Sequence, residues 1–380
     1  MAESHCGNFV RGIVLFFGLI GGAVAQEREL VIGTVLPLSG PVSAVGVPFA
    51  QATRAYIAQV NAKGGVGGYK LRLIERDDGF KPDQTVEGVK AILREAHPIA
   101  FVNIIGAPNN GDLVAQGVLE GNRIPVVGAA TAASSVRNLH SPYLFFVRAG
   151  VADEAHKIVH QLHTTGIERF GLFHANDAFG KDGLTQVQQA LSERKLSLLK
   201  VASYEPASVD VKDAVSKLRG DDLQAIIVFG TGAASSKFVE TYRKAGGNAM
   251  IVASSATSVD VLVKNVGLEA ARGTILAQVL PAVSKGVPLV REYLSTMQQY
   301  GAEGWKPSSY GMEGFVAAKV LVEGLRRAGA KPTRESLIKA LSNMSDFDLG
   351  GYPIAFGKSK REGSTYVDIG IVGPNGTLIN

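Results

Sequence analysis

Cysteine is almost absent from this sequence of 380 residues, which contains only Cys6. A single thiol cannot form a disulfide within the chain, so the fold must gain its stability from its cores. An excess of either charge is also missing, because 39 Lys and Arg face 34 Asp and Glu. No long block of basic residues alternates with aromatic ones, so we expect no nucleic-acid partner.

Long apolar runs are missing except for residues 12–25, which follow Arg11 and end in Ala23-Val24-Ala25. This pattern is typical of a secretory signal peptide. The run is shorter than the ~20 residues that a transmembrane helix needs, although an uncleaved anchor is the alternative. We expect residues 1–25, Cys6 included, to be a signal peptide that is removed after Ala25, and the protein to be exported.

Catalytic and cofactor motifs are missing as well. The sequence contains no Gly-x-Ser-x-Gly, no phosphate-binding P-loop and no His-Glu-x-x-His. Residues 230–235 resemble a dinucleotide fingerprint without its last glycine, and residues 250–257 offer no acid for a ribose. We therefore expect no cofactor and no enzymatic activity.

Two polar clusters have simpler interpretations than catalysis. His156, His160 and His163 share one side of an expected helix and could hold a metal ion, but that side is a flank of the apolar face. We therefore expect surface histidines and no metal. Asp177 could be a base, but an Asn-Asp pair just before a helix favours a helix cap.

The 45 glycines and 46% hydrophobic residues are typical of an α/β protein, and the length favours two domains. Continuous apolar runs such as residues 30–36 predict parallel strands buried on both faces. Helical patterns follow most of them. The strands are expected at residues 30–36, 69–76, 99–105, 124–127, 144–147, 170–173, 196–202, 223–229, 250–253, 273–279, 352–356 and 365–372.

Residues 122–135 form a short apolar strand that runs into small residues, Gly128 to Ser135. Backbone N–H groups there can approach a bound molecule closely, which suits a carboxylate. A tight turn that merely needs small residues is the alternative. Residues 226–236 repeat the design and end in the same Ala-Ala-Ser-Ser, which predicts two similar lobes facing each other.

Several motifs occur together in a recognisable order: residues 32–41 with Pro-Leu-Ser-Gly, residues 60–68, Arg76-Asp-Asp78, Gly128-Ala-Ala-Thr131 and residues 176–180. In this order they resemble the leucine/isoleucine/valine-binding family of periplasmic solute-binding proteins. The resemblance covers essentially all of the chain after residue 25.

The resemblance implies a type I periplasmic-binding fold with two Rossmann-like lobes, each a mostly parallel sheet flanked by helices, joined by three crossovers. Lobe 1 would comprise residues 26–147 and 278–355, and lobe 2 residues 148–277 and 356–380. Such a protein closes on a small-molecule solute and delivers it to an inner-membrane ABC permease complex. We expect it to be a monomer.

The family also implies a carboxylate site. The solute carboxylate would be held by the loop with Asn109 and Asn110 and by the loop with Ala129, Ala130 and Thr131.

Aromatic walls of the site would be Phe179, usually Tyr in the family, and Tyr310. Ser255 stands where amino-acid binders place the Glu that pairs with the solute ammonium. Either Glu313 or Asp177 substitutes for it, or the solute has no amino group, because a buried ammonium without a carboxylate is costly.

The sequence thus predicts a non-catalytic solute-binding component of an ABC importer. Its solute would be a branched-chain amino acid or an aromatic or aliphatic acid. An exported enzyme and a ligand-sensing receptor domain on the same fold are the alternatives.

Overall fold

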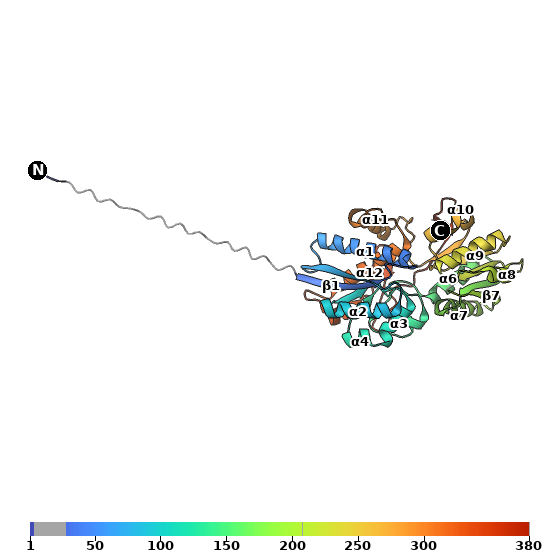
Figure 1. Cartoon of the computed structure of the whole chain (residues 1–380), viewed down its shortest axis with the longest axis horizontal. Helices are drawn as coiled ribbons and strands as arrows, with labels where there is room; N and C mark the ends of the chain where they lie inside the picture. The colour runs from blue at the N-terminus through green and yellow to red at the C-terminus, as the bar shows by residue number, and fades with distance from the viewer. Residues whose placement is uncertain (4–27, 207, 380) are drawn as a thin grey trace.

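The computed structural model describes residues 1–3, 28–206 and 208–379 of the chain. It has two lobes side by side, each a sheet with helices on both faces (Figure 1). The mixed α/β class and the mostly parallel sheets predicted from the sequence are confirmed. The expected signal segment, Cys6 included, falls in residues 4–27 and so lies outside the described residues.

The first lobe is built on a sheet of strand order β2-β1-β3-β4-β5, with all pairs parallel. Its strands are apolar because helices cover both faces. β3 is shorter than the expected 99–105, because Asn103 takes a positive φ of 58° and the chain leaves the sheet. The strands are β1 (Arg28–Leu36), β2 (Tyr69–Asp77), β3 (Ala100–Val102), β4 (Val126–Val127) and β5 (Leu144–Phe145).

Helices cover this sheet in two groups, each with its own hydrophobic core. One face carries α1 (Ser43–Ala62), α11 (Pro288–Tyr300), α12 (Ser309–Arg327) and α13 (Arg334–Ser342). The other carries α2 (Pro82–Ala96), α3 (Ala107–Ala115), α4 (Val118–Asn122) and α5 (Ser134–Arg137).

The second lobe contains a sheet of order β14-β13-β10-β9-β8-β6-β7. Its core strands are parallel, whereas β13 pairs antiparallel with β10 and with β14. The strands are β6 (Phe170–Ala175), β7 (Leu198–Tyr204), β8 (Ala225–Phe229), β9 (Met250–Ala253), β10 (Ile275–Gln278), β13 (Asp368–Val372) and β14 (Leu378–Ile379). The helices are α6 (Val151–Thr164) and α7 (Ala178–Ser192) on one face, and α8 (Lys212–Leu218), α9 (Gly232–Lys244) and α10 (Val259–Ala271) on the other.

The chain passes between the lobes three times: after β5, after β10, and before β13. The expected strand at 352–356 is only β12 (Pro353–Ile354), which forms a two-stranded hairpin with β11 (Phe347–Asp348) instead of joining a large sheet. Tyr352 is fully buried beside these connections, and its hydroxyl lies 2.7 Å from the carbonyl oxygen of Val147 and 3.0 Å from that of Val279. One side chain therefore ties the first two connections together.

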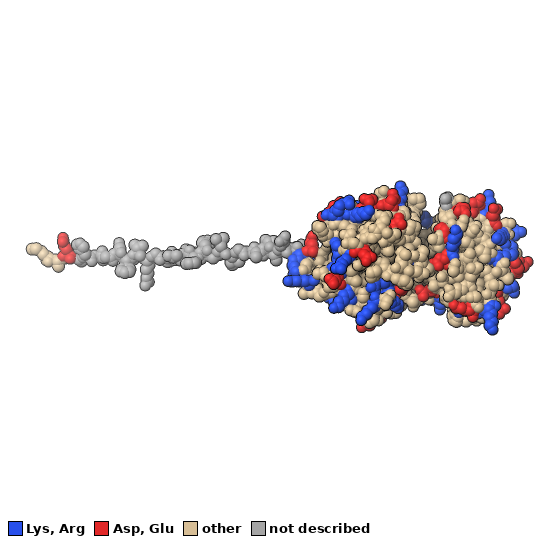
Figure 2. Space-filling model, turned by 90° about the horizontal axis from the view of Figure 1, so that it is seen from below, with Lys and Arg blue, Asp and Glu red and all other residues tan. Residues whose placement is uncertain are grey.

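Acidic and basic residues are interspersed over both lobes on the face that Figure 2 shows, and no area of one sign dominates it. In the part of the chain that the structure describes, none of the helices is both long enough and apolar enough to cross a bilayer.

Gly128, which ends β4, generates a prediction about packing. A Cβ there would lie 2.3 Å from Cβ of Ala317, and its φ is 76°. Gly166 has a similar φ of 84° but open space around it. We expect Gly166→Ala to lower the free energy of unfolding by about 1 kcal/mol through backbone strain, and Gly128→Ala by about 3 kcal/mol because overlap adds to the strain. Urea unfolding of both variants measures this, and equal losses would contradict it.

Candidate functional site

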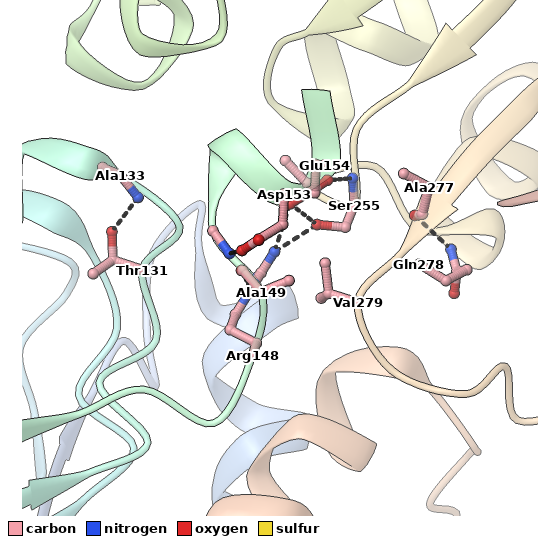
Figure 3. Close-up of polar contacts among 12 residues, drawn as sticks. Thr131, Ala133, Arg148, Ala149, Asp153, Glu154, Ser255, Ala277, Gln278 and Val279 are labelled. Atoms are coloured by element: carbon pink, nitrogen blue, oxygen red, sulfur yellow. Dashed lines mark hydrogen bonds and ion pairs between the residues drawn. The ribbon is translucent and has the colours of Figure 1, made fainter. Parts of the chain in front are cut away.

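Arg148 lies in the first connection between the lobes, and its guanidinium contacts groups from both. Figure 3 shows its contacts with Glu154 and Ser255 of the second lobe. Its Nη2 donates to Oε1 of Glu154 at 3.1 Å and to Oγ of Ser255 at 2.5 Å. Its Nη1 lies 3.5 Å from Oε2 of Glu313, which belongs to α12 of the first lobe. Burial opposes the charge of Arg148, but the two carboxylates outweigh it and raise its pKa.

Glu154, on the first turn of α6, is 1% exposed and fully engaged with neighbours from the second lobe and the connection. Its Oε2 accepts from the backbone N–H of Ser255 at 2.8 Å, and its Oε1 accepts from the Ser255 hydroxyl at 2.8 Å as well as from Arg148. A carboxylate therefore does lie beside Ser255, although residue 255 itself carries none.

Glu313 is also buried, at 5% exposed, but it is poorly satisfied. Its Oε1 has no hydrogen-bond partner among the described residues, and the 3.5 Å contact with Arg148 is long for its Oε2. Burial raises the pKa of Glu313 and the carboxylate of Glu154 adds to this rise, whereas Arg148 and Arg137 oppose it.

A small cavity of about 20 Å³ lies at this cluster, between the lobes. Three residues of the expected site, Ser255, Tyr310 and Glu313, share it. Its lining is Arg148, Ser255, Gln278, Val279, Leu280, Ser309, Tyr310 and Glu313.

A second cavity shares Gln278 and Ser309 with the first, so the two are neighbours. Its lining is mostly apolar and includes Val259, Ala282, Val283 and Leu378, with Asp260 also present. The cluster thus combines a polar space with an adjoining apolar one, which suits a small molecule with an apolar body.

The loop at Ala129–Thr131 follows β4, as expected, but most of its N–H groups are used within the protein. Ala129 donates to the carbonyl of Phe145, Ala130 to that of Ile104, and Thr131 to that of Ala129. The Thr131 hydroxyl accepts from the N–H of Ala133 at 3.2 Å and keeps its own hydrogen to donate (Figure 3). The Thr131 hydroxyl is therefore the group of this loop that keeps a hydrogen to donate, although Thr131 lines neither of the two cavities.

Arg137 supports this loop from within the first lobe. Its guanidinium donates to the carbonyl oxygen of Thr131 at 3.0 and 3.2 Å and to that of Arg148 at 3.0 Å, and it stacks on Phe146. Its Nη1 has no partner among the described residues. Burial, together with the charge of Arg148, lowers the pKa of Arg137 to about 10. A buried positive charge thus lies against Thr131 without a carboxylate in contact.

The lobes also touch at the end of this loop. The N–H of Ser134 donates at 2.7 Å to a carboxylate oxygen of Asp182 on α7. Nearby, the hydroxyl of Tyr310 lies 3.4 Å from the carbonyl oxygen of Ala256. An amide of the small-residue loop therefore already binds a carboxylate, in this case one from the opposite lobe.

Other residues of the expected site lie elsewhere. The amides of Asn109 and Asn110 are buried, donating to the Thr85 hydroxyl and to the carbonyls of Ile104 and Gly106 respectively. Phe179 is half-buried against Phe229, with ring centroids 6.0 Å apart, and lines neither cavity described above. A direct contact of these three side chains with a solute stays a prediction.

Asp177 caps α7 as predicted, with its carboxylate accepting from the N–H of Gly180 at 2.8 Å. Of the two candidates for replacing the missing carboxylate at residue 255, only Glu313 lines the cavity that contains Ser255.

Sequence reasoning missed Arg137, Arg148 and Glu154. Glu154 carried a usable signal, because it lies on the same helix face as the buried Val151 and Ile158, where a charged residue needs a partner. Arg148 lies three residues after a buried strand, at a lobe connection. Arg137 gave no such signal, since four-residue α5 has no periodicity to read.

The family model described as periplasmic binding protein matches residues 29–376. A Leu/Ile/Val-binding protein homolog from Brucella melitensis is 23% identical over 331 residues, 86% of this chain and 87% of the relative.

Among solved structures, a substrate-binding periplasmic protein from Ralstonia solanacearum is 38% identical, with a TM-score of 0.85 over 92% of this chain and 99% of that one. A fatty acid ABC transporter substrate-binding protein from Thermomonospora curvata is 20% identical, with a TM-score of 0.78 over 93% of this chain and 91% of that one. The latter likeness shows the fold alone.

Replacing Arg148 generates a prediction about stability. Arg148→Met leaves Glu154 and Glu313 buried without their shared cation, so we expect the free energy of unfolding to fall by about 3–5 kcal/mol at pH 7. Burial already raises the pKa of Glu313 and Arg148 lowers it, so without Arg148 this pKa would lie further above its value in the unfolded chain. The folded chain would bind more protons than the unfolded chain, so the deficit should shrink as the pH falls from 7 toward about 4.3.

Urea unfolding at pH 7 and pH 5 checks this expectation. Arg72→Met is the control, because Arg72 pairs with Glu29 at the exposed end of the first sheet and such pairs contribute about 0–1 kcal/mol. A pH-independent deficit in Arg148→Met would contradict the electrostatic explanation.

Proposed function

Since the chain belongs to the periplasmic binding protein family, we propose that it is the solute-binding component of an ABC importer and captures a small carboxylate-bearing solute between its two lobes. Its relatives named above are binding proteins. The protein works outside the cytoplasm, in the periplasm, as a monomer without cofactor or catalytic activity. Its partner is a permease complex of the inner membrane.

The main support for a carboxylate is that the buried charge of Arg137 has no carboxylate in contact. Its charge is buried, it bonds only carbonyl oxygens, and it lies directly behind Thr131. A buried cation without a counter-charge is costly, and an anion at the Thr131 hydroxyl would reduce that cost. The contact of Ser134 with Asp182 supports the same preference for carboxylates at this loop.

The rest of the solute is apolar in this proposal. Tyr310 and the neighbouring recess with Val259, Val283 and Leu378 offer apolar surface next to the polar cluster. The relatives include a Leu/Ile/Val-binding protein homolog and a fatty acid ABC transporter substrate-binding protein, so both chemical types occur among their names. Branched-chain amino acids and aromatic or aliphatic acids are therefore the classes to test.

A thermal-shift screen of the chain without residues 1–25 tests the function. A solute that binds only the folded state stabilises it by about 2.7 kcal/mol at a hundredfold excess over Kd. We expect at least one amino acid or amino-free carboxylic acid to raise the melting temperature, and the matching amide or methyl ester to have no effect. Mass spectrometry of the same mixtures should show the acid unchanged. Stabilisation by neutral or cationic solutes only, or conversion of the acid, would refute the proposal.

Thr131→Ala tests the placement of the carboxylate. We expect it to weaken binding of the acid found in the screen by about 1.5–3 kcal/mol, because a hydrogen bond to a charged group is lost. Isothermal titration calorimetry measures the affinity. Thr185→Ala is the matched control, because that exposed hydroxyl bonds only Lys181 within α7. Equal affinities in both folded variants would remove Thr131 from the site.

A further inference from the structure

We propose that Asn375 is a site of spontaneous chemical modification, at which the side-chain amide is lost and the main chain is lengthened by one carbon atom. The chain contains two Asn-Gly dipeptides, Asn110-Gly111 and Asn375-Gly376. Such a dipeptide reacts when the backbone nitrogen of the glycine reaches the side-chain carbonyl carbon of the asparagine, because glycine has no Cβ to hinder the approach. The two dipeptides have opposite surroundings, so the structure selects one of them.

The reaction needs only water. The backbone nitrogen of Gly376 forms a bond to Cγ of Asn375, the C–N bond of the side-chain amide breaks, and ammonia leaves with the proton that the backbone nitrogen gives up. Water then opens the resulting cyclic imide. Opening at Cγ gives aspartate, whereas opening at the main-chain carbonyl gives isoaspartate, in which the main chain runs through Cβ and Cγ. Both products carry a carboxylate in place of the neutral amide.

Asn375 lies at the tip of the hairpin that joins β13 to β14, at the edge of the second sheet. Its side chain is exposed and makes no hydrogen bond with any residue that the structure describes. The N–H of Gly376 donates to the carbonyl of Gly373 at 3.1 Å, and the N–H of Gly373 donates to the carbonyl of Thr377 at 2.9 Å. An exposed turn with so few bonds opens at a low free energy, which releases the nitrogen of Gly376 for the reaction.

Asn110 is an internal control with the same chemistry. It is fully buried in α3, and its amide nitrogen donates to the carbonyls of Ile104 and Gly106 at 3.0 and 2.8 Å. Side chains of a helix point toward its N-terminus, whereas the nitrogen of Gly111 lies on the C-terminal side of Asn110. The reacting atoms are therefore held apart and the leaving amide is anchored. Folding protects this dipeptide and leaves the other one reactive.

The modification of Asn375 disturbs an edge of a core. Val372 and Leu378 pair across the hairpin, and both belong to the hydrophobic core of the second lobe. An additional carbon atom in the turn between them no longer matches the register of the two strands. The new carboxylate also precedes Gly376, which lines the same cavity as Asp260, so it adds a like charge there. The modified protein is therefore less stable than the original one.

Incubation of the purified protein at alkaline pH, folded and in urea, tests the selectivity. Peptide mass spectrometry follows the conversion of amide to carboxylate at both dipeptides, and fragmentation distinguishes isoaspartate from aspartate. In urea the two should react at rates within about twofold of each other, because only the local sequence then matters. In the folded protein Asn375 should react at least about tenfold faster than Asn110. Equal protection of both in the folded protein would overturn the proposal.

Thermal unfolding before and after this incubation tests the consequence. Aged wild-type protein should melt at a temperature lower by about 2 °C or more. Asn375→Gln keeps an amide but would have to form a larger ring, so its melting temperature should stay unchanged on ageing. Fresh Asn375→Asp carries the charge on a main chain of normal length, so it should melt between fresh and aged wild type.

Two results would contradict the destabilising effect: a converted wild-type protein that melts like the fresh one, and an equal loss on ageing in Asn375→Gln. No solute takes part in either measurement, so the inference stands or fails separately from the proposed function.

Discussion

The charge of Arg148 in the space between the lobes is the constraint on which the arrangement depends. Glu154, Ser255 and Glu313 come from α6, from the segment after β9 and from α12, yet all three reach the same guanidinium. Carboxylates can be buried at such positions only where a cation compensates them. The relative placement of these elements, and so of the two lobes at this point, is therefore tied to one side chain.

Arg148 and Arg137 have different surroundings. Arg148 contacts carboxylates, whereas Arg137 bonds carbonyl oxygens and stacks on an aromatic ring. The charge of Arg148 is thus paired with carboxylates of the protein, whereas the guanidinium of Arg137 donates to the backbone of the Thr131 loop. Glu313, at the far side of Arg148, supplies a negative counterpart.

The fold was largely predictable from the sequence, because buried parallel strands such as β1 and β8 are continuous apolar runs that need no long-range information. The prediction was wrong about the extent of two strands. At Asn103 a positive φ ends β3 early, and β12 pairs with β11 in a hairpin instead of joining a large sheet. The placement of Ser255, Tyr310 and Glu313 around one cavity followed from a family resemblance. The charge network was not predicted, because Arg148 and Glu154 become partners only after the chain has folded. Sequence periodicity describes one helix or strand at a time and does not show such contacts.

The bond from Tyr352 to the carbonyls of Val147 and Val279 has a mechanical consequence. A rotation of one lobe against the other must bend the three connections, and this side chain joins two of them, so we expect the pivot to lie close to the hydroxyl. Arg148 follows Val147 directly and is therefore near the axis, where a given rotation produces a short displacement. Ser134 and Asp182 lie on opposite lobes, outside the two connections that Tyr352 joins. The farther such a pair lies from the rotation axis, the more its two members separate for a given rotation. The protein could thus open wide at its rim while its central charge network is only slightly disturbed.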